Sequence, residues 1–304
     1  MLQVLHYCIV LGVKGILLAG GAGSRLGPLT VSTSKHLLAV HDKPMIYYSF
    51  STLLMTGVTE IALIHNPRDK SGYEALLGDG SDFGVEITYI EQIKPLGISH
   101  AFILAEGFLD GDSCALILGD NIFYGAGLGT SLNAVAKDHR VGARVFLKAV
   151  SNPQDYGVAL LEGDVIASVV EKPASAASNL AVTGLYLFDE KCVSVAASLE
   201  PSARGELEIT DMIENYRLKN SLSHTVLGRG LTWVDAGTVQ RVEEASELIR
   251  LIQSREGLMV GSPEEIALGL GNITNEELSD RASGFGRCDY ATYLLNVARL
   301  RNSN

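Results

Sequence analysis

The stretch KGILLAGGAGSRL, residues 14–26, decides the fold of this chain. Its first part, residues 14–19, is a short apolar run typical of a buried strand, and glycines follow it directly. A glycine-rich turn after a strand lets backbone N–H groups approach phosphate oxygens closely. The stretch therefore predicts a strand that leads into a phosphate-binding turn containing Gly20, Gly21 and Gly23.

Two common phosphate-binding motifs do not fit this turn. A dinucleotide-binding turn, as in an NAD-dependent oxidoreductase, would need a third glycine at Leu26, and a Walker loop would end in Gly-Lys-Ser or Gly-Lys-Thr. Arg25 and Lys35 follow the glycines instead. Because arginine clamps a phosphate through two N–H groups and lysine supplies a point charge, both are candidate phosphate ligands. The alternative is a plain turn with two surface cations.

Short apolar runs alternate with amphipathic runs over the first half of the chain. The expected strands are 14–19, 61–64, 85–91 and 114–118, and the expected helices are 47–57, 73–77 and 100–106. This alternation predicts a parallel sheet with helices on both faces, in which ligands bind beyond the carboxyl ends of the strands. The turns after Ala19 and Leu118 should therefore face the same cleft.

The second half of the chain has a different pattern. Close-set strands are expected at 145–150, 157–161 and 165–170, another strand at 185–188, helices at 207–218 and 239–253, and further helical pieces with a loop near 269–271. The close spacing favours antiparallel pairing. We therefore predict an α/β chain with a mixed, mostly parallel central sheet. Its catalytic core would span residues 13–240, and a helical C-terminal segment would span 241–304.

The composition is that of a soluble globular protein, with 47% hydrophobic and 19% charged residues among 304. The net charge of -11 argues against a nucleic-acid partner but allows a small anionic substrate held by local cations. No run is long enough to span a membrane, and residues 1–13 do not resemble a signal peptide, so a cytoplasmic protein is expected. The scattered cysteines are interpreted as buried free thiols: Cys8, Cys114, Cys192 and Cys288.

Two carboxylates follow apolar runs. Asp120 comes directly after residues 114–118, and Asp235 follows Trp233-Val234. Mg²⁺ prefers one or two carboxylates together with substrate phosphates, so the pair is a candidate metal site. Ordinary turn chemistry at Asp120 and a helix N-cap at Asp235 are the alternatives. Lys172 ends another expected strand and is either a phosphate ligand or a solvated lysine.

Ordered motifs from residue 14 to the C-terminus resemble the glucose-1-phosphate thymidylyltransferase family of sugar-1-phosphate nucleotidyltransferases. The motifs are KGILLAGG (14–21), SKHLL (34–38), DKPMIYY (42–48), LGDNIFYG (118–125), EKP (171–173), AVTGLY (181–186) and PSARGELEITD (201–211). The resemblance implies a Rossmann-like nucleotidyltransferase fold, a homotetramer and a Mg²⁺-dependent reaction. In that reaction dTTP and α-D-glucose 1-phosphate give dTDP-glucose and diphosphate.

The resemblance also implies a role for each candidate residue. Arg25 would clamp the triphosphate, Lys35 would bridge the reacting phosphates, and Lys172 would hold the sugar phosphate. Asp120 and Asp235 would bind Mg²⁺. The other nucleotide-binding residues would be Gly20, Gly21, Gly23, His36, Gln92 and Gly97, and the sugar-binding residues would be Asn121, Tyr156, Gly157, Glu171 and Val182. A sugar phosphate is already a nucleophile, so the protein only has to align two anions and neutralise their charge.

The sequence departs from the family pattern around the base and in the tail. His36 and His100 stand where the family has glutamine, Leu96 replaces an aspartate, Ala39 a proline and Ala236 a threonine. Either these changes are neutral or they alter the nucleotide or sugar preference. Gly269-Leu270 replaces an Arg-Lys pair, and residues 125–127 lack the usual His and Asp, so weak or absent feedback inhibition by a nucleotide sugar is expected.

Three other functions are compatible with parts of this pattern. A transferase for UTP, CTP or a purine nucleotide would share the fold, although Gln92 favours a pyrimidine. Another sugar phosphate could also be the acceptor. A non-catalytic nucleotide-sugar sensor is less consistent with the sequence, because a sensor need not keep the whole set of reacting residues.

Overall fold

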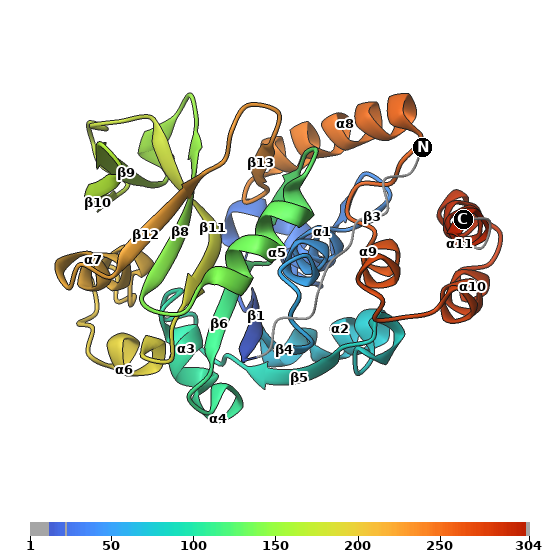
Figure 1. Cartoon of the computed structure of the whole chain (residues 1–304), viewed down its shortest axis with the longest axis horizontal. Coiled ribbons are helices and arrows are strands. Elements are labelled where there is room, and N and C mark those ends of the chain that lie inside the picture. Colours follow the sequence, from blue (N-terminus) through green and yellow to red (C-terminus); the bar gives the residue numbers. More distant parts are fainter. Residues whose placement is uncertain (1–11, 22, 302–304) are drawn as a thin grey trace.

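Strand β1 (Val13–Ala19) lies in the interior of a large central sheet, as its apolar sequence predicts (Figure 1). It pairs in parallel with β4 (Glu60–His65) on one side and β6 (Ser113–Leu118) on the other. The computed structural model describes residues 12–21 and 23–301. Residues 1–11, which include Cys8 and most of the segment tested for a signal peptide, lie outside the described residues.

The central sheet has nine strands in the described part of the chain, in the order β10-β9-β11-β6-β1-β4-β5, with β8 pairing to β11 and β12 to β8. The remaining strands are β5 (Glu86–Glu91), β8 (Ala143–Ala149), β9 (Gly157–Glu162), β10 (Val165–Glu171), β11 (Leu180–Phe188) and β12 (Leu222–Val226). Strand β11 runs antiparallel to β6, β8 and β9, and β10 runs antiparallel to β9. The predicted α/β fold with a mixed, mostly parallel sheet is confirmed.

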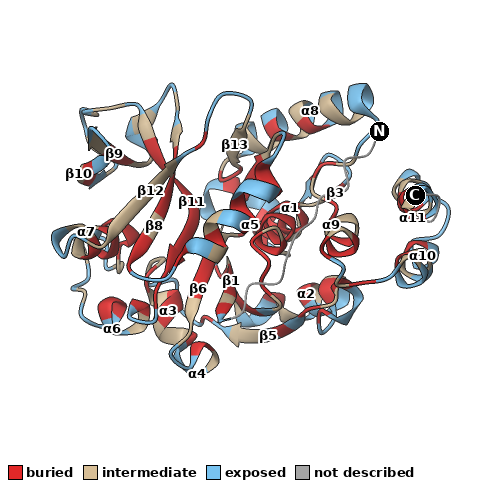
Figure 2. Cartoon of the chain, in the orientation of Figure 1, coloured by how far each residue is buried: buried red, intermediate tan, exposed pale blue. Residues whose placement is uncertain are grey.

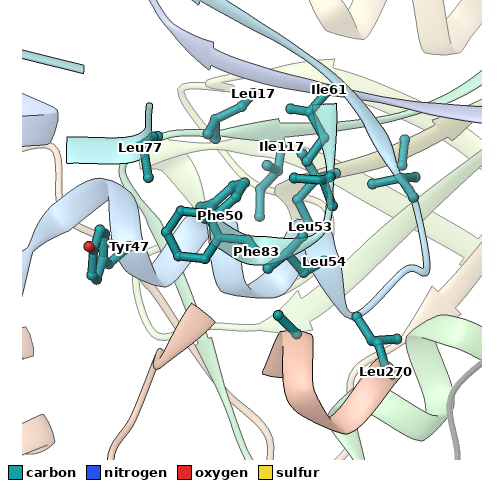
Figure 3. Packing of buried hydrophobic residues seen from close by; sticks show 14 of the residues in the cluster. Leu17, Tyr47, Phe50, Leu53, Leu54, Ile61, Leu77, Phe83, Ile117 and Leu270 are labelled. Atoms are coloured by element: carbon teal, nitrogen blue, oxygen red, sulfur yellow. The ribbon is translucent and has the colours of Figure 1, made fainter. Parts of the chain in front are cut away.

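Helix α1 (Met45–Leu54) is the centre of the larger core, and all ten of its residues are buried. Its Phe50 and Leu53 pack against Leu17 and Ile61 of the sheet (Figure 3). The other helices of residues 12–240 are α2 (Lys70–Leu77), α3 (His100–Leu104), α4 (Glu106–Leu109), α5 (Leu128–Asp138), α6 (Cys192–Ala197) and α7 (Ile209–Leu218). Their buried residues face the sheet and their exposed residues face solvent (Figure 2).

Several predicted boundaries differ from the structure. The helix predicted at 100–106 is two short helices, α3 and α4, separated by Ala105. The helix predicted from residue 207 begins at Ile209, because the backbone of Leu207 pairs with Leu96 and Ser99. The loop predicted at 269–271 is shorter: helix α9 (Pro263–Leu270) continues through residue 270 and ends at Gly271.

The C-terminal helices are α8 (Val239–Glu256), α9, α10 (Asn275–Gly284) and α11 (Asp289–Arg301). Helix α8 packs on a smaller separate cluster of buried residues, and the other three pack onto the same core as the sheet. Ala267, Leu278 and Leu294 belong to one cluster of buried side chains with Leu17 and Phe50. The predicted helical segment is therefore present, whereas its separation from the core at residue 240 stays a prediction.

Residues 12–21 and 23–301 contain no membrane-spanning helix, and two of the three cysteines in this part of the chain are buried. No helix within residues 12–21 and 23–301 is both long and apolar enough to cross a membrane, and the expected cytoplasmic location stays a prediction. Cys114 and Cys192 are buried free thiols whose Sγ atoms lie 3.9 Å apart, as expected. Cys288 is exposed, so the expectation of burial was wrong there, because the residue stands in the turn before α11 rather than inside an apolar run.

Candidate functional site

A cleft of about 350 Å³ opens beyond the carboxyl ends of β1 and β6, where the sheet topology predicts a ligand site. The predicted site residues that line it are Gly21, Arg25, Lys35, His36, Gln92, Gly97, Asp120, Asn121, Tyr156, Gly157, Glu171, Lys172, Val182 and Asp235. Gly20 and Gly23 belong to the turn that forms one wall. The structure therefore brings together residues that are up to 214 positions apart in the chain, from Gly21 to Asp235.

The glycine turn is shaped by the close approach of the Gln92 side chain. A Cβ atom on Gly20 would lie 2.1 Å from Gln92 Oε1, so only glycine leaves room for the Gln92 amide. Gly23 has a φ of 65° and precedes the 3₁₀ helix η1 (Ser24–Thr30), which carries Arg25. The glycine turn thus leads into a helix that carries Arg25 to the cleft. Gly237 lies next to the side chains of both Arg25 and Asp235.

The two candidate metal carboxylates meet through a small separate sheet. Asp120 follows β6, and Asp235 is the last residue of β13 (Thr232–Asp235). Strand β13 pairs antiparallel with β7 (Asn121–Tyr124), with Asp235 opposite Asn121. The helix N-cap alternative for Asp235 is wrong, because the side chain that caps α8 is Thr238.

Cations are already distributed around this carboxylate pair. Lys35 forms an ion pair with Asp120 Oδ2, and Asn121 donates to Asp120 Oδ1 at 3.0 Å. Burial opposes ionisation of Asp120, but the charge of Lys35 and these hydrogen bonds hold its pKa below its usual range. Burial and the neighbouring charge of Asp120 raise the pKa of Asp235 to about 6, despite Lys35 and Arg241. Each carboxylate therefore has a cation beside it, and burial together with the charge of Asp120 disfavours the ionised form of Asp235.

The two carboxylates suit a hard divalent cation that is bound partly by the protein and partly by substrate phosphates. Within the described residues no group of three or more His, Cys, Asp or Glu side chains could hold a metal ion. Two carboxylates with open space beside them suit Mg²⁺, which keeps several positions for water and phosphate oxygens. Asp120 and Asp235 are the residues that would hold such an ion.

The candidate base-binding wall consists of buried polar groups. Gln92 is 2% exposed, and its Nε2 lies 3.4 Å from His100 Nδ1. Gly97 has a φ of 99°, and a Cβ atom there would lie 2.4 Å from the Leu207 carbonyl oxygen. The loop around Gly97 is therefore fixed against the backbone that precedes α7.

His36 lies at the same wall as a neutral imidazole. Burial, followed by the charge of Lys35, lowers the pKa of His36 to about 3. Tyr73 donates to Ser34 Oγ at 2.7 Å, and Ser34 Oγ lies 3.0 Å from His36 Nδ1. We assign the Ser34 proton to this last hydrogen bond, which makes Nδ1 an acceptor and leaves the ring proton on Nε2.

The candidate sugar side is formed by β9, β10 and β11. The Tyr156 ring packs on Trp233 with centroids 4.9 Å apart, and Lys172 Nζ lies 3.2 Å from Glu171 Oε1. Lys172 has a left-handed backbone with φ of 38°, unusual for a lysine at a strand end. Asn121 is more restricted than predicted, since its Oδ1 already accepts from Trp233 Nε1 and the Gly184 backbone.

Two arginines, one that lines the cleft and one that contacts Asp235, are functional candidates that the sequence patterns did not predict. Arg204 lines the cleft, where it pairs with Glu208 at 2.8 Å and reaches Glu171 at 3.5 Å. The motif PSARGELE places an arginine among acidic residues and is the signal that could have found it. Arg241 contacts Asp235 at 2.9 Å. No motif in the sequence around it marks it as a site residue, because its pattern is that of an ordinary residue on a helix surface.

Comparison with known proteins agrees with this arrangement. Residues 14–250 match the family described as nucleotidyl transferase. The chain belongs to the nucleotidyl transferase family. The glucose-1-phosphate thymidylyltransferase of Mycolicibacterium smegmatis is 46% identical over 286 residues, covering 94% of this chain and 99% of the relative. That of Xanthomonas campestris is 46% identical over 288 residues, covering 94% and 97%. The chain is therefore a nucleotidyltransferase of this thymidylyltransferase group.

Solved structures share the fold. A Bacillus anthracis protein assigned as a glucose-1-phosphate thymidylyltransferase, crystallised with a sucrose, is 40% identical with a TM-score of 0.72. The match covers 78% of this chain and 95% of that one. A UDP-glucose pyrophosphorylase complexed with UDP-glucose has a TM-score of 0.69 at 23% identity, which speaks for the fold alone.

Proposed function

We propose that this nucleotidyltransferase joins a nucleoside triphosphate to a sugar 1-phosphate and releases diphosphate, with dTTP and α-D-glucose 1-phosphate among its substrates. The observation that carries the proposal is one cleft containing Arg25 and Lys35 at its glycine turn, Asp120 and Asp235 at its centre, and Lys172 at its far side. The test is diphosphate release from a panel of five nucleoside triphosphates and several sugar 1-phosphates. Absence of product from every pair would disprove it.

The proposed mechanism uses charge and alignment. Arg25 holds the triphosphate beside the glycine turn, and Lys172 holds the phosphate of the sugar on the opposite side. Lys35 lies between them and neutralises the reacting phosphates, so that the sugar phosphate oxygen attacks the α-phosphorus in line. A Mg²⁺ ion on Asp120 and Asp235 would stabilise the charge that develops on the departing diphosphate. A sugar phosphate needs no general base.

The base wall motivates a prediction about nucleotide preference. Gln92 offers both a donor and an acceptor to a thymine or uracil edge, whereas His36, protonated at Nε2, offers a donor only. Thymine and uracil present the same hydrogen-bonding edge, so such a bond separates them from cytosine and the purines but not from each other, and losing one costs about 1 kcal/mol of that discrimination. We therefore expect comparable kcat/KM for dTTP and UTP, and a sharper preference for these two over CTP in His36→Gln.

The measurement is the ratio of kcat/KM for dTTP to kcat/KM for CTP. Lys70→Gln, a change on the surface of α2, is the control and should leave the ratio unchanged. Best use of a purine triphosphate, or a His36→Gln ratio equal to that of the wild type, would contradict this account of the wall.

The family resemblance motivates a second prediction, that four copies of the chain assemble. Helix α9 packs on α1, α10 and α11 pack on each other and on α9, and the exposed face of these three helices is the proposed contact (Figure 2). Light scattering at micromolar concentration should give four times the chain mass of 32.5 kDa. A strictly monomeric mass would rule the assembly out.

The third prediction is that nucleotide sugars inhibit this enzyme only weakly. A second cavity, of about 200 Å³, is lined by Gly125, Gly127 and Gly269, where the family pattern has polar or charged residues. Arg301 lies at its edge, but its guanidinium donates to the Leu268 carbonyl at 2.7 Å. We expect dTDP-sugars to inhibit weakly, and only competitively. Strong inhibition that is non-competitive with both substrates would show that this cavity still binds a nucleotide sugar.

A further inference from the structure

Arg241 connects two sides of the cleft from behind its wall. Its guanidinium donates to Asp235 Oδ2 at 2.9 Å and to Asp155 Oδ2 at 2.7 Å. The same group lies over the Tyr156 ring, 5.1 Å from the centroid. One cation therefore contacts a candidate metal ligand on β13 and the loop that leads into the sugar side.

The position of Arg241 in its helix is unfavourable for a cation. The Thr238 side chain accepts from the Arg241 backbone N–H, which places Arg241 in the first turn of α8. The helix dipole disfavours positive charge at this end, and the first turn contains no acidic residue. The stability of α8 itself therefore does not explain an arginine here, whereas the two carboxylates outside the helix do.

The loop that Arg241 holds has little regular structure of its own. It comprises the short 3₁₀ turn η5 (Pro153–Asp155) and the first residues of β9. The side chain of Asp155 is 46% exposed, and Tyr156 is fixed by packing on Trp233 and by a hydrogen bond from the Lys172 backbone. Arg241 adds the ionic contact that joins this loop to β13.

We propose that Arg241 is a positioning residue that couples the metal-binding side of the cleft to its sugar-binding side, and that it opposes metal binding while supporting sugar phosphate binding. The inference rests on the proposed function. It assigns no contact between Arg241 and a substrate, because the residue acts through Asp235, Asp155 and Tyr156.

The two effects have opposite signs. A divalent ion at Asp235 must approach a carboxylate whose Oδ2 already accepts from a guanidinium, and the two positive charges repel each other in a partly buried site. Removing the cation should therefore tighten metal binding. It should also free the loop of Asp155 and Tyr156, which weakens sugar phosphate binding. General damage to the cleft would weaken both.

The experiment combines Mn²⁺ binding with steady-state kinetics. The Mn²⁺ dissociation constant is measured by electron paramagnetic resonance with the metal alone, and the KM for α-D-glucose 1-phosphate at saturating dTTP and Mg²⁺. For Arg241→Gln we expect Mn²⁺ binding about three- to tenfold tighter, a KM about five- to tenfold higher and a kcat within about threefold of wild type. Arg250→Gln, which removes the same charge from the exposed side of α8, should change none of these values.

Two more variants separate charge from bridging. Arg241→Lys keeps the charge but cannot span both carboxylates, so it should retain wild-type Mn²⁺ affinity and show the raised KM. Asp155→Asn should raise the KM without tightening Mn²⁺ binding, and it serves if Arg241→Gln does not fold. Unchanged or weaker Mn²⁺ binding in folded Arg241→Gln, or an unchanged KM in both Arg241→Gln and Asp155→Asn, would overturn the proposal.

Failure of the proposed function has a different signature. It would appear as a wild-type protein that forms no product from any substrate pair. The Mn²⁺ comparison between wild type and Arg241→Gln would still decide whether Arg241 opposes metal binding at Asp235, because it uses no substrate. If wild type is active and the variants behave like Arg250→Gln, the function stands and only the role of Arg241 falls.

Discussion

Asp120→Asn and Asp235→Asn should each lower turnover by about a hundredfold or more, with the fold intact. Both carboxylates line the cleft, since Asp120 directly precedes the residue that pairs with Asp235, and an amide of the same shape is a much poorer ligand for a hard cation. In the proposed mechanism this ion stabilises the charge on diphosphate, an interaction that becomes strong only in the transition state. The loss should therefore fall on kcat more than on either KM.

The measurement is kcat at saturating dTTP, sugar phosphate and Mg²⁺, together with a thermal unfolding curve for each variant. Asp138→Asn, on the exposed end of α5, is the matched control and should have wild-type turnover. A folded Asp120→Asn or Asp235→Asn enzyme with near-normal kcat would exclude that residue from the metal site.

The amino-acid sequence is sufficient to predict the part of the site that follows from parallel strands. The apolar runs of β1 and β6 are unambiguous, and neighbouring parallel strands end at the same edge of a sheet. The position of Asp120 beside the glycine turn therefore follows from the strand pattern alone. Lys35 is separated from the glycines by η1, so its contact with Asp120 comes from the fold and not from the strand pattern.

The rest of the site depends on contacts between distant segments, which leave no periodic signal in the sequence. Pairing of β13 with β7 puts Asp235 opposite Asn121, although 113 residues separate them in the chain. The same pairing lets Trp233 use the Asn121 oxygen, which a sequence motif cannot reveal. The packing of α9 on α1 is equally hidden, since an apolar helix face does not identify its partner.

Lys35→Gln should also reduce turnover by about a hundredfold or more, but with a loss of stability that distinguishes it from Asp235→Asn. Lys35 is the cation between the two candidate phosphate sites, and glutamine cannot neutralise their charge. Its ion pair with Asp120 is largely buried, with side chains 12% and 9% exposed. Removing one partner of such a pair costs about 3 kcal/mol, because the other charge stays buried beside Asp235.

A double variant separates the two roles of Lys35. Lys35→Gln combined with Asp120→Asn removes both charges, so the unfolding free energy should recover most of the loss seen in Lys35→Gln. Turnover should not recover, because neither the phosphate cation nor the metal ligand is restored. Lys70→Gln is the control for removal of a lysine from an exposed surface. If the double variant regains both stability and turnover, Lys35 serves only as the counter-ion of Asp120, and the phosphates in this cleft are held by other residues.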